Sequence, residues 1–156
     1  MITIRIPGRK EYQLRHLVLD VNGTIAVDGS LINGVADRLR QLSDQLEIHL
    51  LTADTHDKLD EINRGLGIEG HRIPAGNETE AKAHFVDQLG SDSVIAVGNG
   101  SNDAAMLARA GLGLAVLGPE GLSVETLKDA DVVAGDIHTA LDLLLNPKRL
   151  IATLRR

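Results

Sequence analysis

The fold is decided by the stretch His-Leu-Val-Leu-Asp-Val-Asn-Gly-Thr, residues 16–24. Three apolar residues lead to the carboxylate of Asp20, and the turn-forming pair Asn22-Gly23 follows shortly after. A short apolar run bounded by such residues predicts a buried β-strand, here with an acidic group at its carboxyl end. Strands that are apolar on both faces are typical of parallel sheets covered by helices.

Along the rest of the chain, short apolar runs alternate with segments of helical periodicity. Val35, Leu39 and Leu42 fall at helical spacing and predict a helix over about residues 34–45. Further strands are predicted at residues 47–52, 71–73, 93–97, 113–117 and 131–133, and further helices around residues 59–66, 81–89, 106–110, 120–128 and after Asp136 and Pro147. The alternation predicts an α/β fold in which a mainly parallel, Rossmann-like sheet lies between two layers of helices.

Two hairpins are expected beside this core. Alternating apolar residues over 2–6 and the following Pro7-Gly8 predict that residues 1–15 form an N-terminal β-hairpin extension. Asp28-Gly29 lies between short apolar segments and is a strong signal for a two-residue hairpin turn. The 156 residues are expected to form one domain.

The composition argues against several classes of function. Lys and Arg number 16 against 22 Asp and Glu, and the resulting formal charge of −6 disfavours a binder of nucleic acid or of membrane surfaces. The absence of cysteine excludes disulfides and thiolate catalysis. Neither a signal-peptide pattern nor an apolar run of membrane-spanning length occurs, so we expect a soluble cytoplasmic protein.

Polar residues follow three of the predicted strands: Asp20, Thr52 and the segment Asn99–Asp103. In open α/β sheets, ligands bind outside the carboxyl ends of the strands, so these groups are expected to converge there. Taken singly, Thr52 and Asn102 are also explained as helix caps, whereas Asp20, which ends an apolar strand, is harder to explain in this way. Together they suit phosphoryl transfer, in which a carboxylate acts as nucleophile or holds Mg²⁺, a helix start binds phosphate and a lysine neutralises charge.

Four segments in this order resemble the motifs of the haloacid dehalogenase-like (HAD) superfamily: Asp20–Thr24, Leu51-Thr52, Lys82 and Gly98–Asp103. Within the superfamily, the chain is most similar to the phosphorylation domain of P-type ATPases. Thr52-Ala-Asp54 resembles the Thr-Gly-Asp motif of that domain, with Ala53 in place of glycine. The resemblance covers about residues 16–150.

This resemblance implies a three-layer HAD core and roles for individual residues. Asp20 corresponds to the nucleophile, Thr52 to the hydroxyl that binds the phosphoryl group, and Lys82 to the lysine that steadies both. Substrate or phosphate contacts are implied for Asn22, Gly23, Thr24, Ala53, Asp54 and Asn102, and Mg²⁺ ligation for Asp20, Asn22, Asn99 and Asp103.

The residues alone leave alternatives for several of these positions. Lys82 stands one position off the apolar stripe of Ala81, Phe85 and Leu89 and is also compatible with an exposed helix lysine. Asp103 is also compatible with a carboxylate that interacts with a helix dipole. Asp54 is also a candidate helix cap. The six histidines contain no i, i+4 metal-binding pair; His49 is predicted to be a core residue, and His56 is a further candidate for substrate contact.

Two departures from the family pattern affect the expected chemistry. Asn22 stands where family phosphatases carry the aspartate that serves as general acid and base, and an amide cannot transfer a proton in this way. Asn99 stands where the family has a metal-binding aspartate. We therefore expect weaker Mg²⁺ binding and slow hydrolysis.

The spacing of the motifs leaves no room for a cap domain, which many HAD enzymes insert between Thr24 and Thr52 or between Thr52 and Lys82. The site is therefore expected to be open, with the Asp28-Gly29 hairpin as a flap. It would act on a large phosphorylated substrate such as a protein, or be closed over a small molecule by a neighbouring subunit of a homo-oligomer. Ion pumping is not expected of this chain alone.

Three interpretations follow. The leading one is a Mg²⁺-dependent phosphohydrolase that forms an aspartyl-phosphate on Asp20. The alternative is a non-catalytic, regulatory phosphate-binding module, which Asn22 and Asn99 favour. A two-component receiver domain also combines Asp, Thr and Lys in an α/β fold, but receivers place paired acids at the first strand, whereas Asp20 stands alone.

Overall fold

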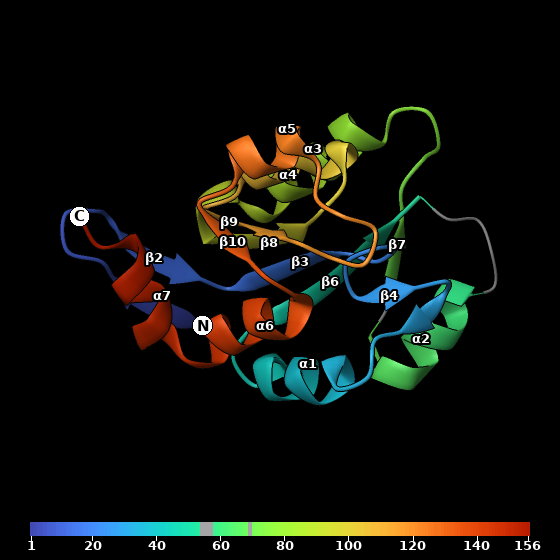
Figure 1. Ribbon diagram of the computed structural model, residues 1–156, viewed down its shortest axis with the longest axis horizontal. Coiled ribbons are helices and arrows are strands. Elements are labelled where there is room, and N and C mark those ends of the chain that lie inside the picture. Colours follow the sequence, from blue (N-terminus) through green and yellow to red (C-terminus); the bar gives the residue numbers. More distant parts are fainter. Residues whose placement is uncertain (54–57, 69) are drawn as a thin grey trace.

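A six-stranded parallel sheet forms the centre of the protein (Figure 1). The computed structural model describes residues 1–53, 58–68 and 70–156. The strands lie in the order β10 (Val132–Ala134), β9 (Leu112–Val116), β8 (Val94–Gly98), β3 (His16–Asp20), β6 (Glu47–Thr52) and β7 (Gly70–Arg72). The predicted α/β fold with a parallel sheet is confirmed.

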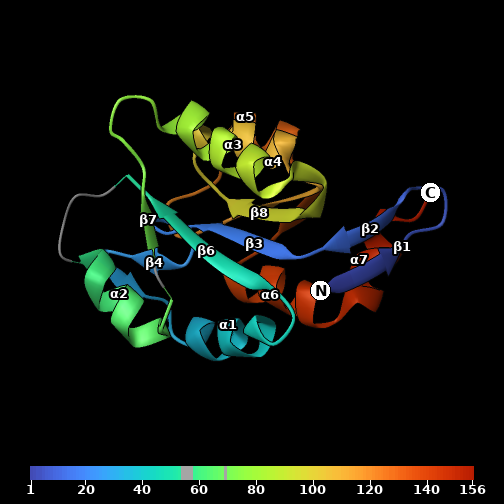
Figure 2. The same cartoon turned by 180° about the vertical axis from the view of Figure 1, so that it is seen from behind.

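Helices cover both faces of the sheet and complete the three layers (Figure 2). One face carries α1 (Val35–Ser43), α2 (Lys58–Leu66) and α6 (Ile137–Leu145), and the other carries α3 (Glu78–Leu89), α4 (Ala104–Arg109) and α5 (Val124–Asp129). Two short 3-10 segments, η1 (Ser91–Ser93) and η2 (Ser101–Asp103), lie on either side of β8 in the chain. Among the helices of the described ranges, none combines the length and the apolar character that crossing a bilayer requires.

The central strand β3 is buried on both faces, as its apolar run predicts. Side chains alternate along a strand, so Leu17 and Leu19 pack in the apolar cluster beneath α1 and α6, and Val18 packs in the cluster beneath α3 and α4. Burial of this kind fixes the register of β3 against β6 and β8, because a slip by one residue would exchange the two faces.

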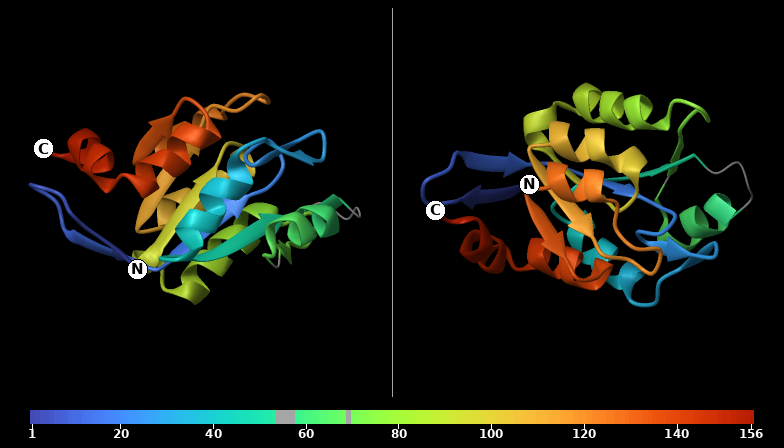
Figure 3. Two further views of the ribbon diagram at one scale, coloured as in Figure 1. Left: turned by 90° about the horizontal axis from the view of Figure 1, so that it is seen from below. Right: turned by 45° about the horizontal axis from the view of Figure 1, so that its top comes forward.

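Two antiparallel hairpins stand beside the sheet. β1 (Ile2–Arg5) pairs with β2 (Glu11–Leu14), and this hairpin extends away from the sheet beside α7 (Pro147–Leu154) and the C-terminus (Figure 3). β4 (Ala26–Val27) pairs with β5 (Ser30–Leu31). Between them, Asp28 and Gly29 have φ angles of 51° and 77°, the left-handed conformation of both central residues that a type I′ turn requires.

The helix predicted over residues 120–128 begins later than expected. α5 starts at Val124, where the Ser123 hydroxyl accepts a hydrogen bond from the N–H of Glu125. Gly118 and Gly121 instead exchange two backbone hydrogen bonds and form a turn. Because Gly118-Pro119 is a turn signal, the chain leaves β9 through a loop before the helix begins. This loop contributes to the cavity described next.

Candidate active site

The carboxyl ends of β3, β6 and β8 meet around an open cavity of about 400 Å³. The chain passes from β3 to β6 and β7 on one side, then returns to build β8, β9 and β10 on the other. β3 therefore lies at the topological switch point, where open α/β sheets bind ligands. The cavity is lined by Asp20, Asn22, Thr52, Ala53, Lys82, Asn99, Gly100, Asn102 and Glu120.

Lys82 is the buried cation of this site. It projects from α3, is 1% exposed, and its Nζ donates to Oδ1 of Asp20 and to Oδ1 of Asp103, each at 2.7 Å. An exposed helix lysine is therefore excluded for this position. The helix turns its Lys82, Ala83 and Val86 face fully inward, while the predicted apolar stripe of Ala81, Phe85 and Leu89 is only half-buried.

Asp103 is completely buried behind the cavity. Its Oδ1 contacts Lys82, and its Oδ2 accepts hydrogen bonds of 3.0 Å from the backbone N–H groups of Asn99 and Gly100. A Cβ at residue 98 would lie 2.5 Å from this carboxylate, so Gly98 is required for its close approach to β8. With both oxygens engaged, Asp103 is placed to hold Lys82 and the loop after β8.

Thr24 lies behind Asp20. Its hydroxyl is within hydrogen-bond distance of Oδ2 of Asp20, at 3.1 Å, and of Oδ1 of Asn99, at 3.0 Å. A hydroxyl has one proton, so it donates to one of these oxygens at a time. The threonine is 1% exposed and is not among the cavity-lining residues of the described ranges. The structure therefore gives it contacts that orient Asp20 and Asn99.

The remaining predicted residues divide between the cavity wall and the segment beyond it. Asn22 donates from Nδ2 to the Thr52 hydroxyl at 3.3 Å, and both line the cavity with Ala53. Asn102 lies at the rim and contacts Glu78 at 3.4 Å. Two predicted residues, Asp54 and His56, lie outside the described residues.

The charges of the buried cluster do not cancel. Two carboxylates, Asp20 and Asp103, face one ammonium group. Burial, followed by the Asp103 charge, raises the pKa of Asp20 to about 7, although Lys82 and the Thr24 hydroxyl partly oppose the shift. Burial alone would lower the pKa of Lys82, but the two carboxylates outweigh it and raise that pKa. Lys82 is therefore charged at neutral pH, and an additional cation in the cavity would stabilise ionised Asp20.

The oxygen donors at the cavity fit a magnesium ion, which prefers carboxylate, carbonyl and water ligands. Asp20, Asn22 and Asn99 line the cavity. Asp103 is fully buried and is not among the lining residues, and its oxygens contact Lys82 and two backbone N–H groups. Of the four predicted ligands, the structure thus brings three to the cavity.

Two cavity residues, Gly100 and Glu120, were given no role by the sequence reasoning. Gly100 lies inside the predicted Gly98–Asp103 motif, whereas Glu120 was missed altogether. It lies in the turn between Gly118 and Gly121, and its carboxylate reaches the space where a Cβ of residue 23 would stand, 2.4 Å from Oε2. Gly23 has a φ of +80°, which favours glycine, and its lack of a Cβ leaves this space to the Glu120 carboxylate. The signal that could have revealed the loop is the Gly118-Pro119 pair, which disfavours the helix predicted from residue 120.

Comparison with protein families identifies residues 4–111 as similar to the haloacid dehalogenase-like hydrolases. An uncharacterized protein of Methanocaldococcus jannaschii is 44% identical over 84 residues, which are 51% of this chain and 90% of that protein. A copper-exporting P-type ATPase of Staphylococcus aureus is 32% identical over 136 residues. These cover 85% of this chain but 16% of the ATPase, so the chain spans only a small part of that relative.

Solved structures show the same architecture. The 3-deoxy-D-manno-octulosonate 8-phosphate phosphatase of Moraxella catarrhalis, in complex with magnesium, phosphate and KDO, superposes with a TM-score of 0.65 at 22% identity, covering 92% of this chain and 95% of that chain. The catalytic domain of the CPx-ATPase CopB-B superposes with a TM-score of 0.61 at 28% identity, covering 74% of this chain and 46% of that chain. The first likeness supports the fold alone.

Proposed function

The chain belongs to the haloacid dehalogenase-like hydrolase family, and we propose that it is a cytoplasmic, Mg²⁺-dependent phosphohydrolase that forms an aspartyl-phosphate on Asp20. The observation that carries this proposal is the buried Lys82, which joins Asp20 to Asp103 at the wall of the cavity. A lysine in this position fixes the attacking carboxylate and supplies positive charge where phosphoryl oxygens would lie. It also explains how an acidic protein could bind an anionic substrate.

In the proposed reaction, a carboxylate oxygen of Asp20 attacks the phosphorus of a phosphate ester. The bond from phosphorus to the ester oxygen breaks, and the leaving oxygen takes a proton from Glu120 and departs as the alcohol. Water then attacks the phosphorus and returns a proton to Glu120, and the bond from phosphorus to the Asp20 oxygen breaks, which releases inorganic phosphate and restores the carboxylate. Lys82 balances the charge throughout, and the Thr52 hydroxyl donates to a phosphoryl oxygen.

Mg²⁺ would be held by the carboxylate of Asp20, the backbone carbonyl of Asn22 and the amide oxygen of Asn99. When bound, it supplies positive charge that stabilises the transferring phosphoryl group. Only one of these ligands is a carboxylate. We therefore expect weaker Mg²⁺ binding than at a site with two carboxylates.

The site lacks a proton donor at residue 22. Asn22 cannot give a proton to the leaving oxygen, so slow turnover is expected. Glu120 is a carboxyl group on the cavity wall outside the Lys82 cluster, and we assign it the acid role that Asn22 cannot fill. Glu120→Gln should then slow hydrolysis of alkyl phosphates more than that of p-nitrophenyl phosphate, whose leaving group needs no proton. Equal slowing of both would remove this assignment.

The openness of the cavity bears on the substrate. The described residues form no cap domain over it, so the site suits a phosphorylated protein or another large phosphate ester, or a small ester enclosed by a second copy of the chain. A phosphatase panel that includes phosphopeptides and sugar phosphates distinguishes these classes.

The central test compares wild type with Asp20→Asn on p-nitrophenyl phosphate, with Mg²⁺ and with EDTA. We expect Mg²⁺-dependent turnover that falls by about 10³-fold or more in the variant. Asp129→Asn, an exposed carboxylate on α5, is the matched control and should retain full activity. Turnover that survives Asp20→Asn would refute the proposal.

A non-catalytic phosphate-binding module is the second candidate, because Asn22 and Asn99 replace two acidic groups. Binding of a beryllofluoride phosphate mimic to wild type, but not to Asp20→Asn, combined with no turnover on any substrate, would favour it over hydrolysis.

A further inference from the structure

A second polar cluster lies at the amino ends of the same strands that carry the candidate active site. It consists of His16 in β3 with Glu47 and His49 in β6, and we call it the histidine cluster. In the parallel register, His16 pairs with Glu47, and alternation along β6 places His49 on the same face as Glu47. All three side chains therefore point to the sheet face that α3 covers.

The ligating atoms of the histidine cluster are closely spaced. Nδ1 of His16 lies 3.2 Å from Nε2 of His49 and 3.4 Å from Oε2 of Glu47, and Nε2 of His49 lies 3.8 Å from Oε1 of Glu47. Four ligands at about 2.0–2.1 Å from a tetrahedral zinc ion stand about 3.3–3.4 Å apart. Octahedral ligands at the same bond length would be only about 2.9 Å apart, so the spacing fits tetrahedral coordination better.

We propose that His16, Glu47 and His49 form a binding site for Zn²⁺, with water as the fourth ligand. Two imidazoles and one carboxylate are a ligand set that suits zinc and related first-row divalent ions. The site is separate from the candidate active site, because four residue steps along β3 from His16 to Asp20 correspond to about 13 Å.

The surroundings of the histidine cluster support ligation over simple packing. His49 is 6% exposed. The ring centroids of His71 and Phe85 lie 5.7 Å and 5.5 Å from the centroid of the His49 ring. This wall restricts the orientation of the His49 ring and excludes water from one side. Between two neutral imidazoles, a direct hydrogen bond uses the lone pair of only one of the facing nitrogens, whereas a metal ion uses both.

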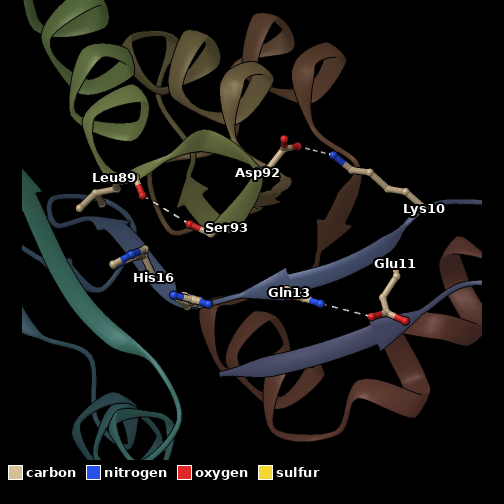
Figure 4. A pocket seen from close by; sticks show the side chains of 8 residues that line it. Lys10, Glu11, Gln13, His16, Leu89, Asp92 and Ser93 are labelled. Carbon is tan, nitrogen blue, oxygen red and sulfur yellow. Dashed lines mark hydrogen bonds and ion pairs between the residues drawn. The ribbon is translucent and has the colours of Figure 1, made fainter.

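The site has a route to solvent. His16 lines an open cavity of about 470 Å³ between the N-terminal hairpin and the end of α3. Figure 4 shows His16 at the Leu89 end of this cavity, away from the Lys10–Asp92 ion pair. The Glu47 side chain is 67% exposed and can rotate onto an arriving ion. A metal ion could therefore enter without opening the sheet.

The test is a Zn²⁺ titration of the full chain against a chromophoric chelator. Millimolar Mg²⁺ is present so that the candidate active site around Asp20, called the acidic site below, is occupied. We expect one zinc ion per chain with micromolar or tighter affinity. His16→Ala and Glu47→Gln, at half-buried and exposed positions, should each weaken it by about tenfold or more. His84→Ala, an exposed histidine on α3, is the matched control and should leave the affinity within twofold of wild type.

A second readout reports the geometry of the site. Co²⁺ in place of Zn²⁺ should give the strong visible absorption of a four-coordinate ion in wild type and His84→Ala, and lose it in His16→Ala. Absence of stoichiometric zinc binding by wild type would overturn the proposal. So would unchanged affinity in His16→Ala and Glu47→Gln, because zinc would then occupy another site.

Discussion

Strands β3 and β6 carry a polar cluster at each end. The cluster at their carboxyl ends contains a lysine side chain, whereas the histidine cluster at their amino ends, as described, contains neither lysine nor arginine. At the carboxyl end, Lys82 of α3 binds the carboxylates of Asp20 and Asp103. At the amino end, α3 places Phe85 over the histidine cluster, which has two imidazoles and a carboxylate. The acidic site is therefore held in place by the chain itself, whereas the histidine cluster would be completed by a bound ion.

The largest expected effect is the loss of the internal cation. Lys82→Met keeps an unbranched apolar side chain of similar length but leaves two buried carboxylates without their cation, so the free energy of unfolding should fall by about 3–5 kcal/mol. Urea denaturation at pH 7.5 measures it. Lys128→Met, at an exposed position on α5, is the control and should change the value by less than about 0.5 kcal/mol.

The double variant Lys82→Met with Asp103→Asn sharpens this prediction. Since removing both partners leaves less uncompensated charge than removing one, the double variant should be more stable than Lys82→Met alone. A Lys82→Met protein as stable as wild type would mean that the carboxyl-end cluster is not held by its cation.

The second prediction restores the carboxyl group that Asn22 replaces. Asn22→Asp places it on the cavity wall beside Thr52, where it can take a proton from the water that hydrolyses the aspartyl-phosphate, so turnover of an aryl phosphate should rise by about 10²-fold. Steady-state kinetics with p-nitrophenyl phosphate measures it, and Asn146→Asp, far along the chain at an exposed position, serves as control. Fast wild-type turnover without any gain in Asn22→Asp would contradict the role assigned to Asn22.

Lys82 and Asp103 show how much of the candidate active site could be predicted from the sequence. The alternation of apolar runs with helical segments predicted the parallel sheet, and the polar residues after three strands predicted which strand ends line the cavity. Periodicity could not decide whether Lys82 was buried, because it stands one position from the apolar stripe that the helix was expected to bury. The contacts of Asp103 depend on how closely η2 approaches β8, which Gly98 permits but which no linear pattern reveals.

The histidine cluster was hidden for a different reason. His16 and His49 are 33 residues apart, and only the pairing of β3 with β6 brings them within 3.2 Å. A search for histidines at helical spacing cannot find such a pair. The sequence analysis did predict His49 in the core, and the structure confirms its burial, which lowers its pKa.

The third prediction concerns pH and the excess charge at the carboxyl end. The pKa of Asp20 is raised to about 7 in the fold, against about 3.9 in an unfolded chain. The folded state binds the proton more tightly, so this contribution to stability is complete below about pH 4 and is lost as pH rises through 7. In EDTA between pH 5 and 8, wild type should lose about 2.5 kcal/mol relative to Asp20→Asn. Urea denaturation at four pH values checks this; parallel curves would show that Asp20 is not destabilised by burial.

The smallest expected effect tests whether the two clusters act independently although they share β3 and β6. Zinc at ten times its dissociation constant should raise the free energy of unfolding by about 1.4 kcal/mol in wild type and by much less in His16→Ala. Turnover in saturating Mg²⁺ should change by less than twofold, because the ion would join β3 to β6 where Leu17 and Leu19 already fix their register. Zinc inhibition that is equal in wild type and His16→Ala would arise at the acidic site. Inhibition or activation that disappears in His16→Ala would instead show that the ion moves Asp20 or Thr52 through these strands, and the two ends of the sheet would then form one coupled unit.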